Sequence, residues 1–481
     1  MIEIPPSSRL GPPALPNEKA GLWAWPLVVL SVFFIGWSVN LFSPDSPVAE
    51  SGENSSEVDP ADLAMLKIQS QVIIAAGTLS PAEAGQTLEE LREMGGGDRG
   101  IASIAMLESF LKVPGSNPEK TAENISSEAS EEMRELVLKA VTEGVEDGER
   151  EALKAYLGWF AELARAPGLD PPPKSTEIRT RALVFLLVVA SVFLVALGAI
   201  IFGGVAIITM IVRQREGKKV SYFDKSVSPR GVMLECFAIY LGIMALGEVA
   251  GVAALRFGGD FQMLVSSPSV PMIFFGASVV IPFLWPIFRG IPYRAFLRSL
   301  GVHRGKGMIK EIGAGIIGYA GVAVFASIGI SLTLLLTLVV GWFDSLPVSP
   351  EGLPGGSEAK GGPSPGPTTH PRVGWIYQGG VVERMLCLLL ASGFAPLFEE
   401  LFFRGALHRY LRGRFKFLVS AVLTGLIFAA LHPQGWMAIP ALTAMGAGFS
   451  MLREWRDSLI APMVAHAVNN GILVGILCLG L

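Results

Sequence analysis

Apolar residues in this chain are gathered into long blocks, and the lengths of these blocks limit the folds available to it. A helix needs about 20 consecutive apolar residues to cross the hydrocarbon core of a bilayer. Most of the blocks satisfy this, and only Phe417–Leu431 and Met437–Leu452 are short: Trp23–Phe42, Ala182–Val212, Val232–Leu255, Val270–Phe288, Met308–Phe343, Val381–Phe398, Phe417–Leu431, Met437–Leu452 and Leu459–Leu481. The sequence therefore predicts an all-α fold, a polytopic transmembrane helical bundle of about nine spans.

Charge separates a soluble segment from the membrane part. Residues 43–174 contain 25 acidic and 11 basic residues, whereas the rest of the chain contains 17 acidic and 27 basic residues. Apolar residues recur within the acidic segment at spacings of three and four, which is typical of amphipathic helices. We therefore predict a small, acidic, α-helical soluble domain inserted between the first two spans.

These patterns divide the chain into five parts. In order, they are an N-terminal tail with the first transmembrane helix (1–44), the acidic soluble domain (45–178), transmembrane helices of unknown role (179–343), a Gly/Pro/Ser-rich loop (344–378) and the last four spans (379–481).

Basic loops predict the orientation, because Lys and Arg accumulate on the cytoplasmic side of short loops. With nine spans, the basic segments Arg213–Arg230, Arg289–Lys310 and Arg404–Lys416 all fall on one side. We expect a multi-pass protein of a prokaryotic plasma membrane, with a cytoplasmic N-terminus and an extracytoplasmic acidic domain. We expect the lipid bilayer as its surroundings and no nucleic-acid partner.

The first polar cluster in the last four spans is a pair of adjacent glutamates. Two carboxylates among apolar residues are very unfavourable without partners. Glu400 and Arg404 are four positions apart and share a helix face, so they can form an ion pair. Glu399 is turned about 100° away from Glu400. The spacing therefore assigns Glu400 a structural role and Glu399 the role of general base.

Two further clusters carry histidine. His432 precedes Pro433, and a residue before proline is pushed out of helical geometry, so His432 is expected at a helix end. His466 and Asn470 are four positions apart in the last span and can face one site. Ionisable residues within spans are rare and usually functional, so these clusters indicate a site inside the membrane.

The span limits place Glu399 near the cytoplasmic face and His432 near the opposite end of its span. The two residues can meet only if the span before His432 is short or broken and ends inside the bilayer.

Three motifs on successive spans resemble the CPBP family of intramembrane proteases (CAAX protease and bacteriocin-processing, or Abi). The resemblance covers about Val381–Leu481, and the motifs are Glu399-Glu400-x-x-x-Arg404, Phe428-x-x-x-His432 and His466-x-x-x-Asn470. It implies a helical bundle whose core helices enclose a cavity open to the cytoplasm and the bilayer. The activity that it implies is endopeptidase cleavage of a membrane-associated peptide or protein, as in CAAX prenyl proteases.

The resemblance also implies individual roles. Glu399 and His432 would activate water, and His466 and Asn470 would stabilise the oxyanion. The residues of structural support are Glu400, Arg404 and Phe428.

The sequence leaves open whether a metal ion takes part in the reaction. Glu399, His432 and His466 would make a Zn²⁺ triad with an open position, although the His-Glu-x-x-His motif is absent. A metal-free glutamate mechanism fits the same residues equally well.

Three other functions are weighed against the protease. An intramembrane serine protease could use Gly448-Phe449-Ser450, but that reading leaves the glutamates and His432 unexplained. An ion-coupled transporter could use the buried Glu and His residues, yet no inverted repeat supports it. A non-catalytic scaffold or immunity protein would rely on residues 45–178, which could also bind an extracytoplasmic partner.

Overall fold

The computed structural model describes a helical protein. None of the described residues lies in a β-strand, in agreement with the predicted all-α fold. The described residues are 19–41, 60–80, 85, 87–88, 91–92, 97–113, 115–126, 130–168, 174–218, 220–221, 223, 230–259, 269–344, 376–377 and 379–480. The predicted Gly/Pro/Ser-rich loop 344–378 lies outside them apart from Asp344, Ile376 and Tyr377, as does the N-terminal tail up to residue 18.

The chain forms two compact units. Unit 1 contains residues 1–46, 196–368 and 389–471, and unit 2 contains residues 47–195, 369–388 and 472–481. Three helices have residues in both units: α8 (Ser175–Arg215), α15 (Val381–Leu389) and α20 (Ile460–Gly480).

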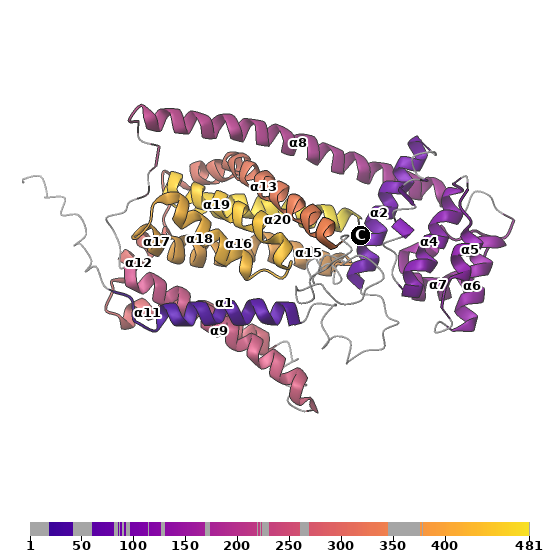
Figure 1. The fold of residues 1–481 in the computed structure, drawn as a ribbon, viewed down its shortest axis with the longest axis horizontal. Helices are drawn as coiled ribbons and strands as arrows, with labels where there is room; N and C mark the ends of the chain where they lie inside the picture. The colour runs from indigo at the N-terminus through magenta and orange to yellow at the C-terminus, as the bar shows by residue number, and fades with distance from the viewer. Residues whose placement is uncertain are drawn as a thin grey trace, which may run out of the picture. The chain divides into compact units, whose positions relative to one another are not determined.

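Unit 2 is built mainly from the acidic segment, and Figure 1 shows its helices α4 to α7 grouped together. Its own helices are α2 (Pro60–Leu79), α4 (Gly97–Leu111), α5 (Pro118–Glu123), α6 (Glu131–Thr142), α7 (Asp147–Leu157) and the 3₁₀ turn η1 (Gly158–Leu163). Ser130 caps α6 by accepting a hydrogen bond from the Met133 backbone N–H, which satisfies one of the free N–H groups at a helix start.

Helix α4 forms the centre of unit 2, and most of its side chains are buried against the neighbouring helices. Its Glu108 is fully buried, yet it accepts hydrogen bonds from Arg92 at 2.7 Å and from Thr121 at 2.9 Å. A buried carboxylate is tolerated when partners of this kind replace water. The acidic segment therefore has a genuine folded core.

Unit 1 holds the remaining helices. They are α1 (Ala24–Leu41), α9 (Arg230–Phe257), α11 (Ser269–Phe288), α12 (Tyr293–Leu300), α13 (Met308–Asp344), the π-helical segments η2 (Leu390–Phe394) and η3 (Leu401–Leu407), α16 (Ala395–Glu400), α17 (His408–Arg412), α18 (Phe417–Ala430), the 3₁₀ turn η4 (Trp436–Ala438) and α19 (Ile439–Arg456). Helix α19 packs against both α13 and α18, and Figure 1 shows these helices side by side.

Five helices of the described chain are long and apolar enough to cross a membrane: Ser175–Arg215, Gly231–Ala254, Met308–Val340, Val381–Arg412 and Ile460–Gly480. Shorter apolar helices cover Ala24–Gly36, Leu63–Leu79, Met272–Phe288 and Phe417–Ala430. The integral membrane nature of the chain is thus clear, but the predicted count of about nine spans is not confirmed.

Helix α18 is short. The sequence predicted that Glu399 and His432 can meet only if the helix before His432 is short or broken. Its 14 residues measure about 21 Å at 1.5 Å per residue, less than the roughly 30 Å of a hydrocarbon core. The chain then turns through His432 and returns as α19, which packs against α18. His432 therefore lies in the turn of a short helical hairpin.

Glycine allows the two helices of this hairpin to approach closely. A Cβ on Gly425 of α18 would lie 2.3 Å from the Thr443 carbonyl oxygen of α19. A Cβ on Gly446 would lie 2.9 Å from the Gly425 Cα atom. Small residues serve the same purpose at many helix contacts in membranes.

Gly425→Ala should lower the stability of the protein by about 1–3 kcal/mol, because the added methyl group overpacks the α18–α19 contact. Gly475→Ala in α20 is the matched control, since a Cβ there meets nothing within 4 Å. Thermal unfolding of both variants in detergent measures the difference. Equal melting temperatures for the two variants would contradict the close contact.

Candidate functional site

The two glutamates lie on a helix that changes between π-helical and α-helical turns. Residues 381–412 form one candidate span, in which the α-helical stretch Ala395–Glu400 is flanked by the π-helical segments η2 and η3. Single π-helical turns occur often at functional sites, because the extra residue redirects neighbouring side chains. Glu399 and Glu400 thus stand at the end of the α-helical stretch, where the winding changes.

Glu400 holds the site together as a fully buried carboxylate. Its Oε1 atom accepts a hydrogen bond from Arg404 Nη1 at 2.8 Å, within a fully buried ion pair. The same oxygen lies 2.9 Å from Nδ1 of His466 in α20. The predicted pairing of Glu400 with Arg404 is confirmed, and the link to His466 joins two helices that are distant in sequence.

Arg404 is enclosed by aromatic rings. Its guanidinium carbon lies 4.8 Å from the Phe428 ring centroid and 5.2 Å from that of Phe449. Its Nη2 atom also donates to the Gly446 carbonyl oxygen at 3.0 Å. Cation–π contacts of this kind stabilise a desolvated guanidinium. Phe428 therefore supports the site by packing, as its place in the motif implied.

Glu399 is the more accessible carboxylate. Its side chain is 25% exposed, whereas that of Glu400 is fully buried. Its Oε2 atom lies 3.7 Å from His466 Nε2, and this buried oxygen accepts no hydrogen bond from any described residue. His466 thus stands between the two glutamates, with one ring nitrogen directed at each. An unsatisfied carboxylate oxygen beside a histidine is a suitable place for a reactive water molecule.

His432 has a defined tautomer. Its Nδ1 atom lies 2.7 Å from the Phe428 carbonyl oxygen, and because a carbonyl oxygen only accepts, Nδ1 carries the proton. In the neutral ring the Nε2 lone pair is then available as an acceptor. The negative charge of Glu399 acts on this ring, and the ring packs on Phe428, which also contacts His466.

Asn470 follows His466 in α20 by four positions. Its Nδ2 atom donates to the Ala391 carbonyl oxygen at 2.9 Å, and its Oδ1 atom accepts a hydrogen bond from Asn469 at 3.1 Å. Tyr319 in turn donates to Asn469 at 3.1 Å. Ala391 belongs to η2, so Asn470 fixes α20 against the π-helical segment that precedes the glutamates.

The three zinc candidates do not form a ready ligand set. Within the described part of the chain, no group of three His, Cys, Asp or Glu side chains is placed to hold a metal ion. Both Nδ1 atoms are engaged, that of His466 with Glu400 and that of His432 with Phe428, which leaves the two Nε2 atoms as the ring nitrogens that could bind a metal.

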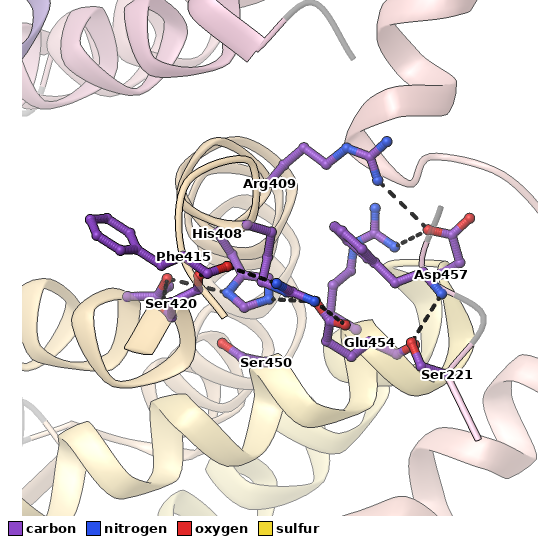
Figure 2. A network of polar contacts seen from close by, with 12 residues as sticks. Ser221, His408, Arg409, Phe415, Ser420, Ser450, Glu454 and Asp457 are labelled. Atoms are coloured by element: carbon purple, nitrogen blue, oxygen red, sulfur yellow. Dashed lines mark hydrogen bonds and ion pairs between the residues drawn. The ribbon is translucent and has the colours of Figure 1, made fainter. Parts of the chain in front are cut away.

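A second buried polar cluster joins α17, the last part of the glutamate span, to α18 and α19, and Figure 2 shows His408 next to Glu454 of α19. His408 Nε2 is 3.4 Å from Glu454 Oε1, and Arg412 contacts both carboxylate oxygens. Thr424 of α18 lies 3.4 Å from His408 Nδ1. We call His408, Arg412, Thr424 and Glu454 the His408 cluster.

Next to this cluster, Figure 2 shows Arg409 directed at Asp457. Asp457 also accepts a hydrogen bond from Arg453 at 3.0 Å. The Phe223 ring lies under Arg409 at 4.6 Å and under Arg453 at 5.0 Å. The basic side chains at this end of unit 1 are thus held by acidic and aromatic partners.

The prediction that Arg404–Lys416 is a loop was wrong. The helix continues to Arg412, and Arg404, Arg409 and Arg412 are buried. The recurrence of polar residues every fourth position, at 404, 408 and 412, was the available signal of a buried helical stripe.

Comparison with known proteins agrees with this geometry. Residues 382–472 match the family model "Rce1-like: Type II CAAX prenyl endopeptidase Rce1-like". These residues are similar to that family, and they make up about a fifth of the chain. The resemblance predicted from the three motifs is thereby confirmed for the domain that carries them.

A curated relative agrees as well. Over 93 residues the chain is 31% identical to "Membrane-embedded CAAX protease MroQ" of Staphylococcus aureus (strain USA300). The match covers 18% of this chain and 37% of the relative, so the chain spans little more than a third of that protein's length. No solved structure matches the chain.

Glu454→Gln should destabilise the protein by about 3–5 kcal/mol, because it removes the charge that balances buried Arg412. Glu151→Gln is the control, because Glu151 is exposed and its ion pair with the exposed Lys154 is long, at 4.0 Å. Unfolding of both variants in detergent checks this. A Glu454→Gln protein as stable as the Glu151→Gln protein would show that the His408 cluster adds nothing to the fold.

Proposed function

We propose that this protein is an intramembrane endopeptidase that hydrolyses a peptide bond of a membrane-associated substrate. The observation that carries the proposal is the position of buried His466 between a structural carboxylate, Glu400, and a partly exposed one, Glu399. The match of residues 382–472 to a family of CAAX endopeptidases supports the same reaction class.

Water activation is assigned to Glu399 and His432. Glu399 takes a proton from the water while the water oxygen attacks the peptide carbonyl carbon. The Nε2 lone pair of His432 accepts the second O–H of the water and fixes its orientation. Collapse of the tetrahedral intermediate breaks the C–N bond, and Glu399 returns its proton to the departing amine. General bases of this kind accelerate reactions by about 10²–10⁴-fold.

Charge balance explains how His466 stabilises the oxyanion. His466 contacts both glutamates, and Arg404 pairs with Glu400, so positive charge and N–H donors lie beside the carboxylates. When Glu399 accepts the water proton, its negative charge moves to the oxyanion, which also faces His466. Donors placed in advance at such a position are among the largest contributions to catalysis. Asn470 can act in two ways. Its side-chain amide can be a second hydrogen-bond donor beside His466, or it can hold α20 in place so that His466 keeps its position.

The substrate class follows from the surroundings of the site. Glu399, Glu400 and His466 lie on helices that are long and apolar enough to cross a membrane, so we propose that the scissile bond belongs to a peptide or protein at or in the bilayer. The name of the relative points to CAAX-type substrates, and we propose such a substrate for this chain at family level. The folded acidic unit is proposed to bind an extracytoplasmic partner.

The orientation remains our proposal of a prokaryotic plasma membrane with a cytoplasmic N-terminus. It is supported by the contacts among the basic segments in unit 1. Ser221 donates to the Glu454 carbonyl oxygen at 3.0 Å, and Arg453 donates to the Leu300 carbonyl oxygen at 3.3 Å. These contacts bring two basic segments to the end of α19, where Arg412 also contacts Glu454, as a common cytoplasmic side requires.

Glu399→Gln should reduce kcat for peptide cleavage by about 10²–10⁴-fold while leaving the melting temperature nearly unchanged, because the amide cannot accept the water proton. Glu383→Gln, the same change at an exposed position of the same span, is the control. The comparison uses purified protein with membrane peptides, identified first by profiling wild-type against Glu399→Gln membranes. Full activity of Glu399→Gln would sink the mechanism.

Metal dependence is tested separately. Active protein washed with chelator should retain cleavage, and elemental analysis should find less than one zinc per chain. Activity that is lost on chelation and restored by stoichiometric zinc would assign Glu399, His432 and His466 to a metal site instead.

A further inference from the structure

Unit 2 contains a cavity of about 410 Å³ that the proposed reaction does not use. It is lined by residues of α2, by the first turns of α8, by Arg384 of α15 and by the last residues of α20. Helices α8 and α20 are candidate membrane spans, and α15 is the first part of a third. The cavity therefore lies where spans leave the apolar layer and meet the acidic helices.

Its polar half is strongly basic. Lys67, Arg181 and Arg384 line the cavity, and Glu162 is the single acidic residue among the lining residues. Lys67 is only 7% exposed and lies 5.5 Å from the Trp159 ring centroid. The cavity thus concentrates positive charge within a unit whose sequence is otherwise acidic.

The cations act on one another. Burial, together with the positive charges of Arg384 and Arg181, lowers the pKa of Lys67 to about 8, although Glu162 opposes this shift. Backbone and side-chain contacts orient the arginines: Arg384 donates to the Ile376 carbonyl oxygen at 3.1 Å, and Arg181 pairs with Glu177. A bound anion would relieve the mutual repulsion of the three cations.

The other half of the cavity is apolar and continuous with exposed helix surface. Val184 of α8 and Leu479 of α20 line it and are 55% and 62% exposed. Phe185 and Val188 line the same wall. Such exposure on candidate spans is the surface that lipid chains cover. The ligand should therefore carry an apolar chain as well as a negative charge.

Close packing fixes the base of the cavity. Gln71 of α2 donates to the Gly480 carbonyl oxygen at 2.7 Å. A Cβ on Gly480 would lie 3.1 Å from both Ile68 and Phe185. These contacts join α2, α8 and α20 within unit 2, so the basic and apolar halves are held together by one packed junction.

We propose that this cavity binds the phosphate group of an anionic phospholipid, with the headgroup at Lys67, Arg181 and Arg384 and an acyl chain along α8 and α20. Arginine suits phosphate because its planar fork can donate two parallel hydrogen bonds. Free phosphate offers the same charge but leaves the apolar wall unused. The bound lipid would link the acidic helices to the ends of the spans.

The test uses the full-length protein in a neutral detergent. Thermal unfolding is followed with increasing phosphatidylglycerol, phosphatidylcholine or inorganic phosphate. Phosphatidylglycerol should raise the melting temperature most, and its apparent Kd should weaken by at least about tenfold in the Lys67→Gln/Arg384→Gln protein, because charged hydrogen bonds are lost. Lys120→Gln/Lys154→Gln removes the same charge from exposed positions of unit 2, outside the cavity, and should leave the Kd unchanged.

Arg384→Lys keeps the charge and guards against a folding defect, so it should bind the lipid more tightly than the double variant does. Equal stabilisation by phosphatidylcholine would overturn the proposal, as would an unchanged Kd in the double variant. A response to inorganic phosphate that matches the response to phosphatidylglycerol would overturn the lipid assignment. None of these readouts depends on proteolysis, so they are independent of the proposed function.

Discussion

A buried carboxylate shared by an arginine and a histidine is the interaction on which the site depends. Glu400 contacts Arg404 on its own helix and His466 on α20 through one oxygen atom. Removing one partner of such a group costs several kcal/mol, since an uncompensated charge then remains in a medium of low dielectric. The interaction therefore fixes the helix of the glutamates against the last helix. Once that contact is set, Glu399 can stay partly exposed and unsatisfied.

Part of this arrangement could be predicted from short-range spacing. Residues four apart on a helix face the same way, which was enough to pair Glu400 with Arg404. Proline after His432, together with a short apolar block, indicated where α18 would end. Local rules of this kind do not depend on how the helices pack.

The rest required the tertiary structure. Glu400 and His466 are 66 positions apart, and no spacing rule states which ring nitrogen faces which glutamate. Glu454 and the π-helical segments were missed for the same reason, because buried arginines look like a cytoplasmic loop until their partner is known. The acidic segment was recognised from its charge, but its junction with α8, α15 and α20 depends on contacts between distant residues.

The short hairpin of α18 and α19 also affects how the topology is counted. Two antiparallel helices joined inside the bilayer begin and end on the same side of it. Whether they are regarded as two spans or as one re-entrant pair, α20 starts from the side where α17 ended. Uncertainty in the number of spans at this point therefore leaves the predicted sidedness of both termini unchanged.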